Sequence, residues 1–427
     1  MVREGYKQTK VGVIPEDWDA TTLGSVAEVI MGQSPKGTSY NRDGNGLPLI
    51  NGPTEFTKKY PIKVQWTTEP TKLCKPLDLL LCVRGSSTGR MNIANDEFCL
   101  GRGVAAIRAN SKANTEYLTY QVHLAVEKLL ALSAGSTFPS VDSKAIKSIP
   151  VPCPRPEEQR SIAQALSDVD ALIASLDKLI AKKRYLKTAT MQQLLTGKKR
   201  LPGFGEGKGE RQTEIGVIPE DWEVNSLGEI TEYIKGFAFK SSDFQAYGVR
   251  VIRVSDTTFD FIKNESEIFI DEKKAKNFRK WAMREGDLII STVGSKPPMY
   301  DSMVGKATFV DAKNANSLLN QNAVIIRCKD WSLEAQVFLH NHLRQPKYID
   351  HIEKIFRGNA NQASITLKEL FNFLIPTPKG KEEQREIATV LSDMDAEIAA
   401  LETRLAKTQA LKQGMMQELL TGKTRLV

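Results

Sequence analysis

The chain carries an internal repeat, and this limits its possible folds more than any other feature of the sequence. Residues 12–18 (GVIPEDW) recur without change at 216–222, a shift of 204 positions. The motifs EEQR at 157–160 and LLTGK at 194–198 both return 225 positions later. The two shifts differ, so the regions between the motifs differ by insertions. We therefore expect two half-chains, each a variable globular region followed by a frame segment of constant length.

The length and local patterns predict an α+β protein of several parts. A chain of 427 residues exceeds what one hydrophobic core usually organises. Short β-branched runs between glycines and prolines predict a small sheet in each globular region, and helices are expected at 116–132 and 333–355. The expected parts are a first globular domain (1–155), a central frame helix (156–200), a glycine-rich flexible connector (201–211), a second globular domain (212–380) and a C-terminal frame helix (381–427).

Both frame segments carry the heptad pattern of long helices that pair. Apolar residues recur at alternating steps of four and three in each segment, and the pattern continues to Leu186 and Leu194 and to Leu411, Met415 and Leu419. We expect the two helices to form an antiparallel coiled coil related by a pseudo-twofold axis, each ending at a left-handed glycine, Gly197 or Gly422. The alternative is that each amphipathic helix packs on its own domain. The predicted seam consists of Ile162, Leu166, Val169, Ile173, Leu176, Ile180, Ile387, Leu391, Met394, Ile398, Leu401 and Leu405.

The sequence lacks the signatures of several classes of chemistry. Five cysteines without CxxC spacing favour reduced thiols over disulfides or a zinc site. No run of about 18 apolar residues occurs, so we expect no membrane insertion and a cytoplasmic protein. Neither a glycine-rich cofactor turn nor the Asn/Asp-Pro-Pro-aromatic tetrad of adenine methyltransferases is found, and the four histidines lack metal or triad spacing. Glu272 and Lys274 are interpreted as part of a solvated charge run. We expect no catalytic residue, metal or cofactor in this chain.

The repeated motifs resemble those of one known family. Two globular regions, each opening with Ile-Pro-x-x-Trp and leading into a helix that starts at EEQR and closes on LLTGK, are similar to the specificity subunit of Type I restriction-modification enzymes. The resemblance covers essentially the whole chain. It implies a non-catalytic subunit whose two target-recognition domains read the halves of a bipartite, asymmetric site in double-stranded DNA.

The resemblance also implies partners. Two modification (adenine methyltransferase) subunits would dock on the frame, whose helices set the gap between the half-sites. Two restriction (motor-nuclease) subunits would join where the system has them. S-adenosylmethionine, ATP and Mg would bind these partners and not this chain. Two alternatives remain, a coiled-coil scaffold that does not bind DNA and a single-chain DNA-modifying enzyme.

Residues that read DNA are expected on loops that follow apolar strands. Guanidinium groups pair with guanine and carboxamides pair with adenine in the major groove. The two halves differ here, since residues 294–298 (GSKPP) replace the turn at 84–89 (RGSSTG), which leaves the contacts of the second loop open. The candidates are Gln33, Ser34, Arg84, Ser86, Ser87, Arg90, Arg102, Ser136, Thr137 and Ser140 in the first half, and Lys240, Ser241, Ser295, Lys296, Asn320, Gln321, Asn322, Arg357, Asn359, Asn361 and Gln362 in the second.

Overall fold

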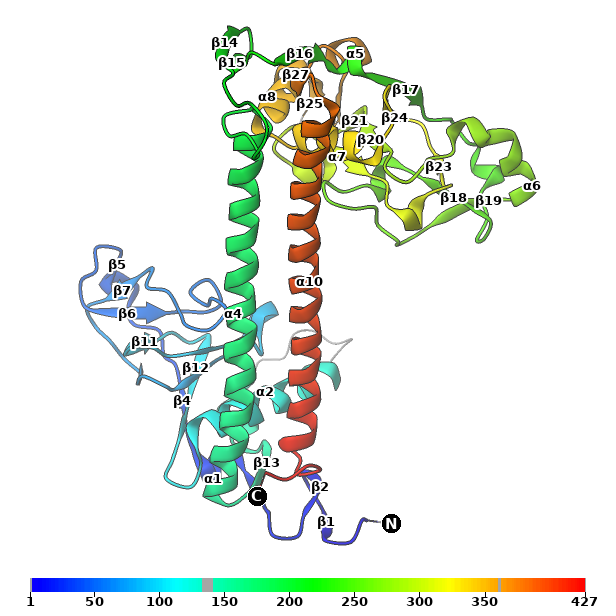
Figure 1. The fold of residues 1–427 in the computed structure, drawn as a ribbon. Helices are drawn as coiled ribbons and strands as arrows, with labels where there is room; N and C mark the ends of the chain where they lie inside the picture. Colours follow the sequence, from blue (N-terminus) through cyan, green and yellow to red (C-terminus); the bar gives the residue numbers. More distant parts are fainter. Residues whose placement is uncertain (1, 133–140, 360–361, 427) are drawn as a thin grey trace. The chain divides into compact units, whose positions relative to one another are not determined.

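The computed structural model describes residues 2–132, 141–359 and 362–426, and the chain divides into two compact units. Unit 1 holds residues 1–178 and 402–427, and unit 2 holds residues 179–401. The two longest helices, α4 (Pro156–Leu194) and α10 (Lys381–Leu419), are 39 residues each. Each unit therefore combines one globular region with part of α4 and part of α10 (Figure 1).

Unit 1 contains two larger sheets and three helices of its own within its described residues. Its strands are β1 (Tyr6–Thr9), β2 (Gly12–Pro15), β3 (Asp19–Thr22), β4 (Ala27–Met31), β5 (Tyr40–Asn41), β6 (Leu47–Ile50), β7 (Trp66–Thr67), β8 (Leu73–Cys74), β9 (Leu79–Cys82), β10 (Met91–Ile93), β11 (Phe98–Leu100), β12 (Val104–Ala109) and β13 (Pro150–Cys153), and its helices are α1 (Leu23–Val26), α2 (Thr115–Leu132) and α3 (Ser143–Lys147). One sheet is antiparallel with the order β10-β9-β12-β4, and the other has the order β5-β7-β6-β11-β8.

The antiparallel sheet of unit 1 is buried on both faces. Leu79 and Leu81 of β9 belong to a core cluster with α2 and α3, whereas Leu80 and Cys82 belong to a cluster with β6 and β11 of the other sheet. Successive side chains of a strand point to opposite faces, so one apolar run serves two cores. The sheet is thus held between a helical layer and a second sheet, with its ends free to carry loops.

Unit 2 has fourteen strands and five α-helices of its own within its described residues. Its strands are β14 (Glu210–Thr213), β15 (Gly216–Pro219), β16 (Trp222–Ser226), β17 (Thr231–Lys235), β18 (Val249–Ile252), β19 (Ile268–Ile270), β20 (Leu288–Ser291), β21 (Val293–Gly294), β22 (Ala307–Phe309), β23 (Leu318–Leu319), β24 (Ala323–Cys328), β25 (Arg357–Asn359), β26 (Gln362–Ser364) and β27 (Leu374–Pro378), and its helices are α5 (Leu227–Ile230), α6 (Glu272–Ala275), α7 (Leu333–His342), α8 (Pro346–Ile355) and α9 (Leu367–Leu370). The sheet β17-β24-β20-β22 corresponds to β4-β12-β9-β10 of unit 1. Ile289 and Ile325 face β18 and β23, while Leu288 and Ile326 face α7 and α8.

The helical stretch expected at 333–355 is present but is divided into two helices. The structure has α7 and α8 in its place, separated by residues 343–345. Pro346 is the first residue of α8, where its missing N–H is not needed, and it disfavours helical backbone at the residue before it. The chain therefore turns at this proline, and both helices still cover the same sheet face.

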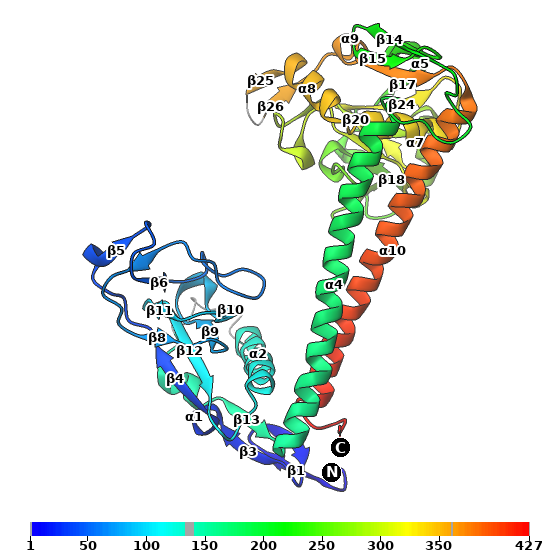
Figure 2. The same cartoon turned by 60° about the vertical axis from the view of Figure 1, so that its left-hand side comes forward.

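Parts of α4 and α10 run side by side within each unit (Figures 1 and 2). In unit 1, Ile162 and Leu166 of α4 share a core with Met416 and Leu419 of α10. In unit 2, Met191 and Leu194 of α4 share a core with Ile387 and Leu391 of α10. The two globular regions lend side chains to these cores, including one tryptophan in each unit.

Most of the predicted seam residues are well covered. Seven are buried, namely Ile162, Leu166, Leu176, Ile180, Ile387, Leu391 and Ile398, and five are half-buried, namely Val169, Ile173, Met394, Leu401 and Leu405. Leu186 and Leu411 of the extended pattern are 41% and 59% exposed, whereas Leu194 and Leu419 are 3% and 5% exposed and Met415 is half-buried. The apolar pattern therefore reaches the last turns of both helices, with Leu186 and Leu411 off the covered face.

An arginine cluster closes unit 2. The Arg200 guanidinium donates to both oxygens of Asp221 at 2.9 Å and to both oxygens of Glu383 at 2.5 and 2.7 Å. Trp222 donates its indole N–H to Glu383 at 3.1 Å, and the guanidinium lies 5.6 Å from the Trp222 ring centre. We call these four residues the unit 2 clamp. It ties the segment after α4 to the start of α10 and to the GVIPEDW motif.

Unit 1 has the corresponding clamp. Arg425 donates to both oxygens of Asp17 at 2.9 Å and to both oxygens of Glu158 at 2.6 and 2.8 Å. Trp18 donates its indole N–H to Glu158 at 2.9 Å. Its arginine follows α10, so each clamp joins the segment after one long helix to the first turn of the other.

Candidate nucleic-acid interface

The candidate residues of unit 1 gather at one end of the sheet β10-β9-β12-β4. Because this sheet is antiparallel, β4 and β9 end where β10 and β12 begin. Gln33 and Ser34 follow β4, the loop 84–90 joins β9 to β10, and Arg102 lies just before β12. Sequence positions up to 69 residues apart are thus brought to one sheet end.

Backbone contacts fix this end of the sheet. The Gln33 N–H donates to the carbonyl of Leu100 at 2.8 Å, and the Arg102 N–H donates to the Ser34 hydroxyl at 3.2 Å. A Cβ on Gly32 would lie 2.2 Å from the carbonyl oxygen of Gly101, so only glycine allows this close approach. The loop 84–90 is anchored nearby, since the Val83 N–H donates to the carbonyl of Gly103 at 2.9 Å.

Unit 2 gathers its candidates at the equivalent sheet end. There β17 and β20 end, and β22 and β24 begin. The loop 320–322 leads into β24, and its Asn322 carbonyl accepts the Thr292 N–H at 2.8 Å just after β20. A Cβ on Gly236, the counterpart of Gly32, would lie 1.8 Å from the Asn320 carbonyl oxygen.

The second half departs from the first in the loop that follows β20. The counterpart loop in unit 1 begins with Gly85 at φ +75° and a short 3₁₀ turn, whereas β21 continues as a strand. β21 pairs with β26, and β26 pairs with β25. Arg357, Asn359 and Gln362 therefore extend from a small sheet attached beside Ser295 and Lys296.

Some candidates are not part of these groups. Lys240 and Ser241 lie at a 3₁₀ turn beyond β17, and in the described structure no hydrogen bond joins them to the other candidates. Ser136, Thr137, Ser140 and Asn361 lie outside the described residues. Of the described candidates, Ser87, Ser295 and Asn320 are half-buried and all others are exposed. The two sheet ends thus offer guanidinium, ammonium, carboxamide and hydroxyl groups to solvent.

The opposite end of each sheet is closed by a buried ion pair. Arg108 of β12 donates to both oxygens of Asp78 at 2.9 and 2.7 Å, and Arg327 of β24 donates to both oxygens of Asp287 at 2.8 and 2.7 Å. These bonds to a carboxylate raise the pKa of both arginines further above its ordinary value. The arginines therefore stay charged and cross-link neighbouring strands, which makes the sheets rigid platforms for the exposed loops.

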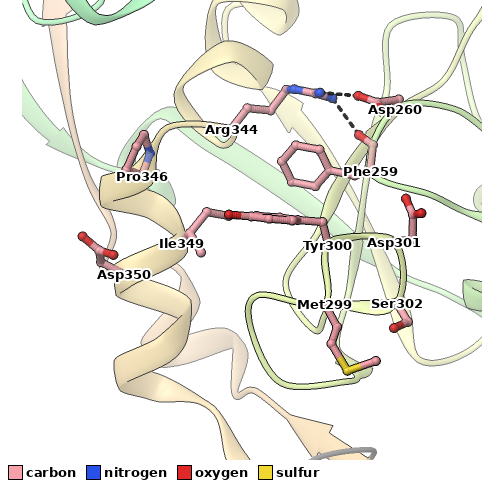
Figure 3. Close-up of a pocket in the computed structure, with 10 residues that line it drawn as sticks. All are labelled: Phe259, Asp260, Met299, Tyr300, Asp301, Ser302, Arg344, Pro346, Ile349 and Asp350. Carbon is pink, nitrogen blue, oxygen red and sulfur yellow. Dashed lines mark hydrogen bonds and ion pairs between the residues drawn. The ribbon is translucent and has the colours of Figure 1, made fainter. Parts of the chain in front are cut away.

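Unit 2 also contains a cavity of about 720 Å³ that the sequence did not predict (Figure 3). The Arg344 guanidinium lies 4.3 Å from the centre of the Phe259 ring, donates to the Phe259 carbonyl at 2.6 Å and pairs with Asp260. The Phe259 and Tyr300 rings meet edge to face at 5.4 Å. Asp301 and Asp350 also line the cavity. The Arg344 guanidinium is already paired, and Asp301 and Asp350 add negative charge to the lining. The cavity is therefore unsuited to bind a phosphate group of DNA.

Sequence reasoning missed the cavity and the two clamps for different reasons. The cavity joins residues 259–260, 299–302 and 344–350, and no sequence signal connects these segments. The clamps could have been found by applying the two shifts of the repeat, which carry Asp17 to Asp221 and Arg200 to Arg425.

The described residues offer no sign of catalytic metal chemistry. Residues 2–132, 141–359 and 362–426 contain no group of three or more His, Cys, Asp or Glu placed to hold a metal ion. Within the same ranges, no helix has both the length and the apolar character needed to cross a membrane.

The chain is similar to known specificity subunits of Type I restriction enzymes. A specificity subunit of the Type I restriction enzyme MjaVIII from Methanocaldococcus jannaschii is 27% identical over 424 residues, covering 99% of this chain and 96% of that protein. The EcoBI specificity subunit of Escherichia coli is 22% identical over 426 residues, covering 95% of this chain and 85% of that protein. The crystal structure of a Type I restriction-modification S subunit from M. genitalium has a similar fold, with a TM-score of 0.58 and 16% identity over 94% of this chain and 96% of that one.

A family model decides the assignment. The model described as the Type I restriction modification DNA specificity domain matches residues 15–182 and again residues 219–412, so it covers most of the chain in two copies. These two matches include both sheet ends that carry the exposed donors. The chain belongs to the family of Type I restriction-modification DNA specificity subunits, which are non-catalytic, with the activities residing in partner subunits.

Proposed function

We propose that this chain reads the two halves of a bipartite, asymmetric DNA site, one half with each unit. The observation that carries this proposal is the pair of exposed sheet ends, which are built on equivalent strands but present different side chains. Unit 1 offers mainly arginines with Gln33, and unit 2 offers mainly carboxamides with Lys296 and Arg357. Because guanidinium groups favour guanine and carboxamides favour adenine, the two ends would select different sequences.

We further propose that α4 and α10 form an antiparallel coiled coil within an internal repeat with a pseudo-twofold axis. Several features support this arrangement. In unit 2, Lys183 pairs with Glu397 at 2.6 Å and Lys187 pairs with Asp395 at 2.5 Å, so partner numbers fall along α10 as they rise along α4. Each helix of 39 residues is about 58 Å long at about 1.5 Å per residue, enough to serve as a spacer between half-sites.

The same repeat favours two copies of a docking partner. Each clamp joins three equivalent segments, namely the stretch after one long helix, a GVIPEDW motif and the first turn of the other long helix. A protein that binds one frame segment would therefore also bind the other. On α4, Leu179 and Leu186 are 38% and 41% exposed and Tyr185 is 75% exposed, which leaves apolar surface for a partner. We propose two modification subunits there, with S-adenosylmethionine on them, and ATP and Mg on restriction subunits where the system has them.

The test is to map methylated adenines on a random DNA library with the chain assembled on its modification subunits. Wild type should give one asymmetric two-part motif. Arg84→Ala should relax one base position of one half only, by about 1 to 3 kcal/mol of discrimination, and Gln321→Ala should act on the other half. The matched control Arg42→Ala removes an exposed arginine outside the sheet end and should leave the motif unchanged. A motif that is the same in all four proteins would show that the sheet ends do not read DNA.

Two further measurements separate the alternatives. Equal affinity of the assembled complex for unrelated duplexes at physiological salt would favour a scaffold without sequence recognition. Methyl transfer by the purified chain alone would favour a complete enzyme.

The spacer role of the frame helices has its own test. Insertion of about four residues, close to one turn, into one frame helix should alter the gap of the motif while both halves stay the same.

A further inference from the structure

A basic segment of unit 2 takes the place of a shorter and less basic connection in unit 1. Residues 271–281 (DEKKAKNFRKW) form α6 and a 3₁₀ helix, and they join β19 to Ala282, which bridges to Leu318 of β23 (Figure 1). In unit 1 the equivalent connection between β7 and β8 is residues 68–72 (TEPTK), with a single lysine. The connection in unit 2 therefore carries five basic residues where that of unit 1 carries one.

The segment is amphipathic, with an aromatic face turned inward. Phe278 and Trp281 pack on Phe237, with ring centres 5.0 and 4.5 Å away, and Phe278 also packs on Phe239 at 5.1 Å. Ala275 is buried in the same cluster with β18 and β23. These contacts hold the segment in place through apolar packing, so its charged side chains are not needed for its fold.

The outward face carries positive charge without compensation. Lys273, Lys276, Arg279 and Lys280 are exposed, and the structure of the described residues contains no ion pair to any of them. Lys274 differs, because it pairs with Asp243 at 2.6 Å. The segment's own Asp271 accepts the N–H groups of residues 273 and 274 as a helix cap, and Glu272 is its one other acid. Four cations therefore lie on one short stretch of exposed surface.

This basic face lies close to the candidate reading loop of unit 2. Phe237, which supports the aromatic face, donates its N–H to the carbonyl of Leu319 at 3.0 Å and forms a β-bridge with Asn320. One aromatic layer therefore separates the basic segment from the loop 320–322. Side chains that enter a major groove, which is about 12 Å wide, have a row of phosphates on either side. A cationic face beside the loop 320–322 is therefore well placed to meet one of these rows.

We propose that residues 273–280 bind the phosphate backbone of the DNA beside the half-site that unit 2 reads. This rests on the proposed function, since it assumes that the loop 320–322 reads bases. Phosphate contacts fix orientation and supply affinity, but they carry no sequence information.

The test is the salt dependence of DNA binding by the chain assembled with its modification subunits. The triple variant Lys276→Gln, Arg279→Gln and Lys280→Gln removes three charges and keeps the aromatic face. Each lost phosphate contact lowers the slope of log K against log salt by about 0.9, so the slope should become shallower by about 2 to 3. Cognate and unrelated duplexes should weaken by the same factor, and the methylated motif should not change.

A matched control removes the same charge elsewhere in unit 2. Lys368, Lys379 and Lys381, all exposed and located around α9 and the start of α10, are replaced by Gln together. The control should keep the wild-type slope. An unchanged slope in the 276/279/280 variant, or an equal change in the control, would overturn the inference. If wild type itself shows no preference for its mapped site, the proposed function fails instead, so the two failures are distinguishable.

Discussion

Truncation of the clamp arginine in unit 2 tests how the frame is held together. In Arg200→Ala the Glu383 carboxylate, whose side chain is 4% exposed, keeps only the indole N–H of Trp222 as a side-chain partner. A buried charge that loses its partner costs about 3 to 5 kcal/mol. Asp221 is 29% exposed, so the loss of its pair adds little, and we expect a destabilisation of about 4 kcal/mol.

The measurement is equilibrium urea unfolding followed by far-UV circular dichroism and tryptophan emission. A chain of two compact units need not unfold in one step, so hydrogen exchange at the start of α10 assigns the affected transition to unit 2. Lys381→Ala is the control, because its pair with Asp330 joins side chains that are 69% and 80% exposed. The control should change stability by less than about 1 kcal/mol.

A second substitution identifies the physical cause. Glu383→Gln replaces the buried carboxylate with a neutral amide of similar shape, so the double variant Arg200→Ala/Glu383→Gln should be more stable than Arg200→Ala alone, by about 1 to 2 kcal/mol. Arg425→Ala should act in the same way on unit 1, with a smaller effect because Arg425 is 26% exposed. The reasoning is refuted if Arg200→Ala matches the Lys381 control, or if the added Glu383→Gln makes it less stable.

Three further predictions concern a buried ion pair, a buried histidine and a close backbone approach, all in unit 2. Arg327→Ala should destabilise unit 2 by about 3 to 5 kcal/mol in urea unfolding, because Asp287 is fully buried. Burial lowers the pKa of His342 to about 3, so the unfolded chain takes up the proton first as pH falls below about 6.5. Stability should then fall by about 1.4 kcal/mol per pH unit until the folded pKa is approached, and His342→Leu should remove this contribution from the pH dependence of the urea midpoint. Gly236→Ala should displace Asn320 and blur one half of the methylated motif, and an intact motif would show that this close approach is not required.

The long helices could be predicted because their signals are regular and local. Heptad spacing locates α4 and α10, and the EEQR and LLTGK motifs lie at their ends. The left-handed backbone at Gly197 and Gly422, with φ of 70° and 73°, follows from the same local pattern. Each of these features depends on residues close together in sequence, which is why the sequence alone was sufficient.

Features made by distant residues were harder to predict. The cavity beside Arg344 joins three separate segments, and the break before Pro346 was missed because the apolar pattern continues across it. Glu272 and Lys274 were interpreted as part of a solvated charge run. The sequence does not reveal that Phe278 and Trp281 anchor the surrounding segment 271–281 against Phe237. Tertiary packing supplies this information.

The clamps and buried ion pairs recur in both halves while the exposed loops differ, and protein stability gives a physical reason for this contrast. Replacing one member of a clamp or of the Asp287–Arg327 pair leaves a buried charge, and such losses are among the largest that single substitutions cause. Substitutions on exposed loops usually change stability by less than about 0.5 kcal/mol. The buried partners are therefore tightly constrained in both halves, whereas the loops at the sheet ends can differ freely. A duplicated chain under these constraints keeps one frame and acquires two unlike surfaces, which is the arrangement that an asymmetric DNA site requires.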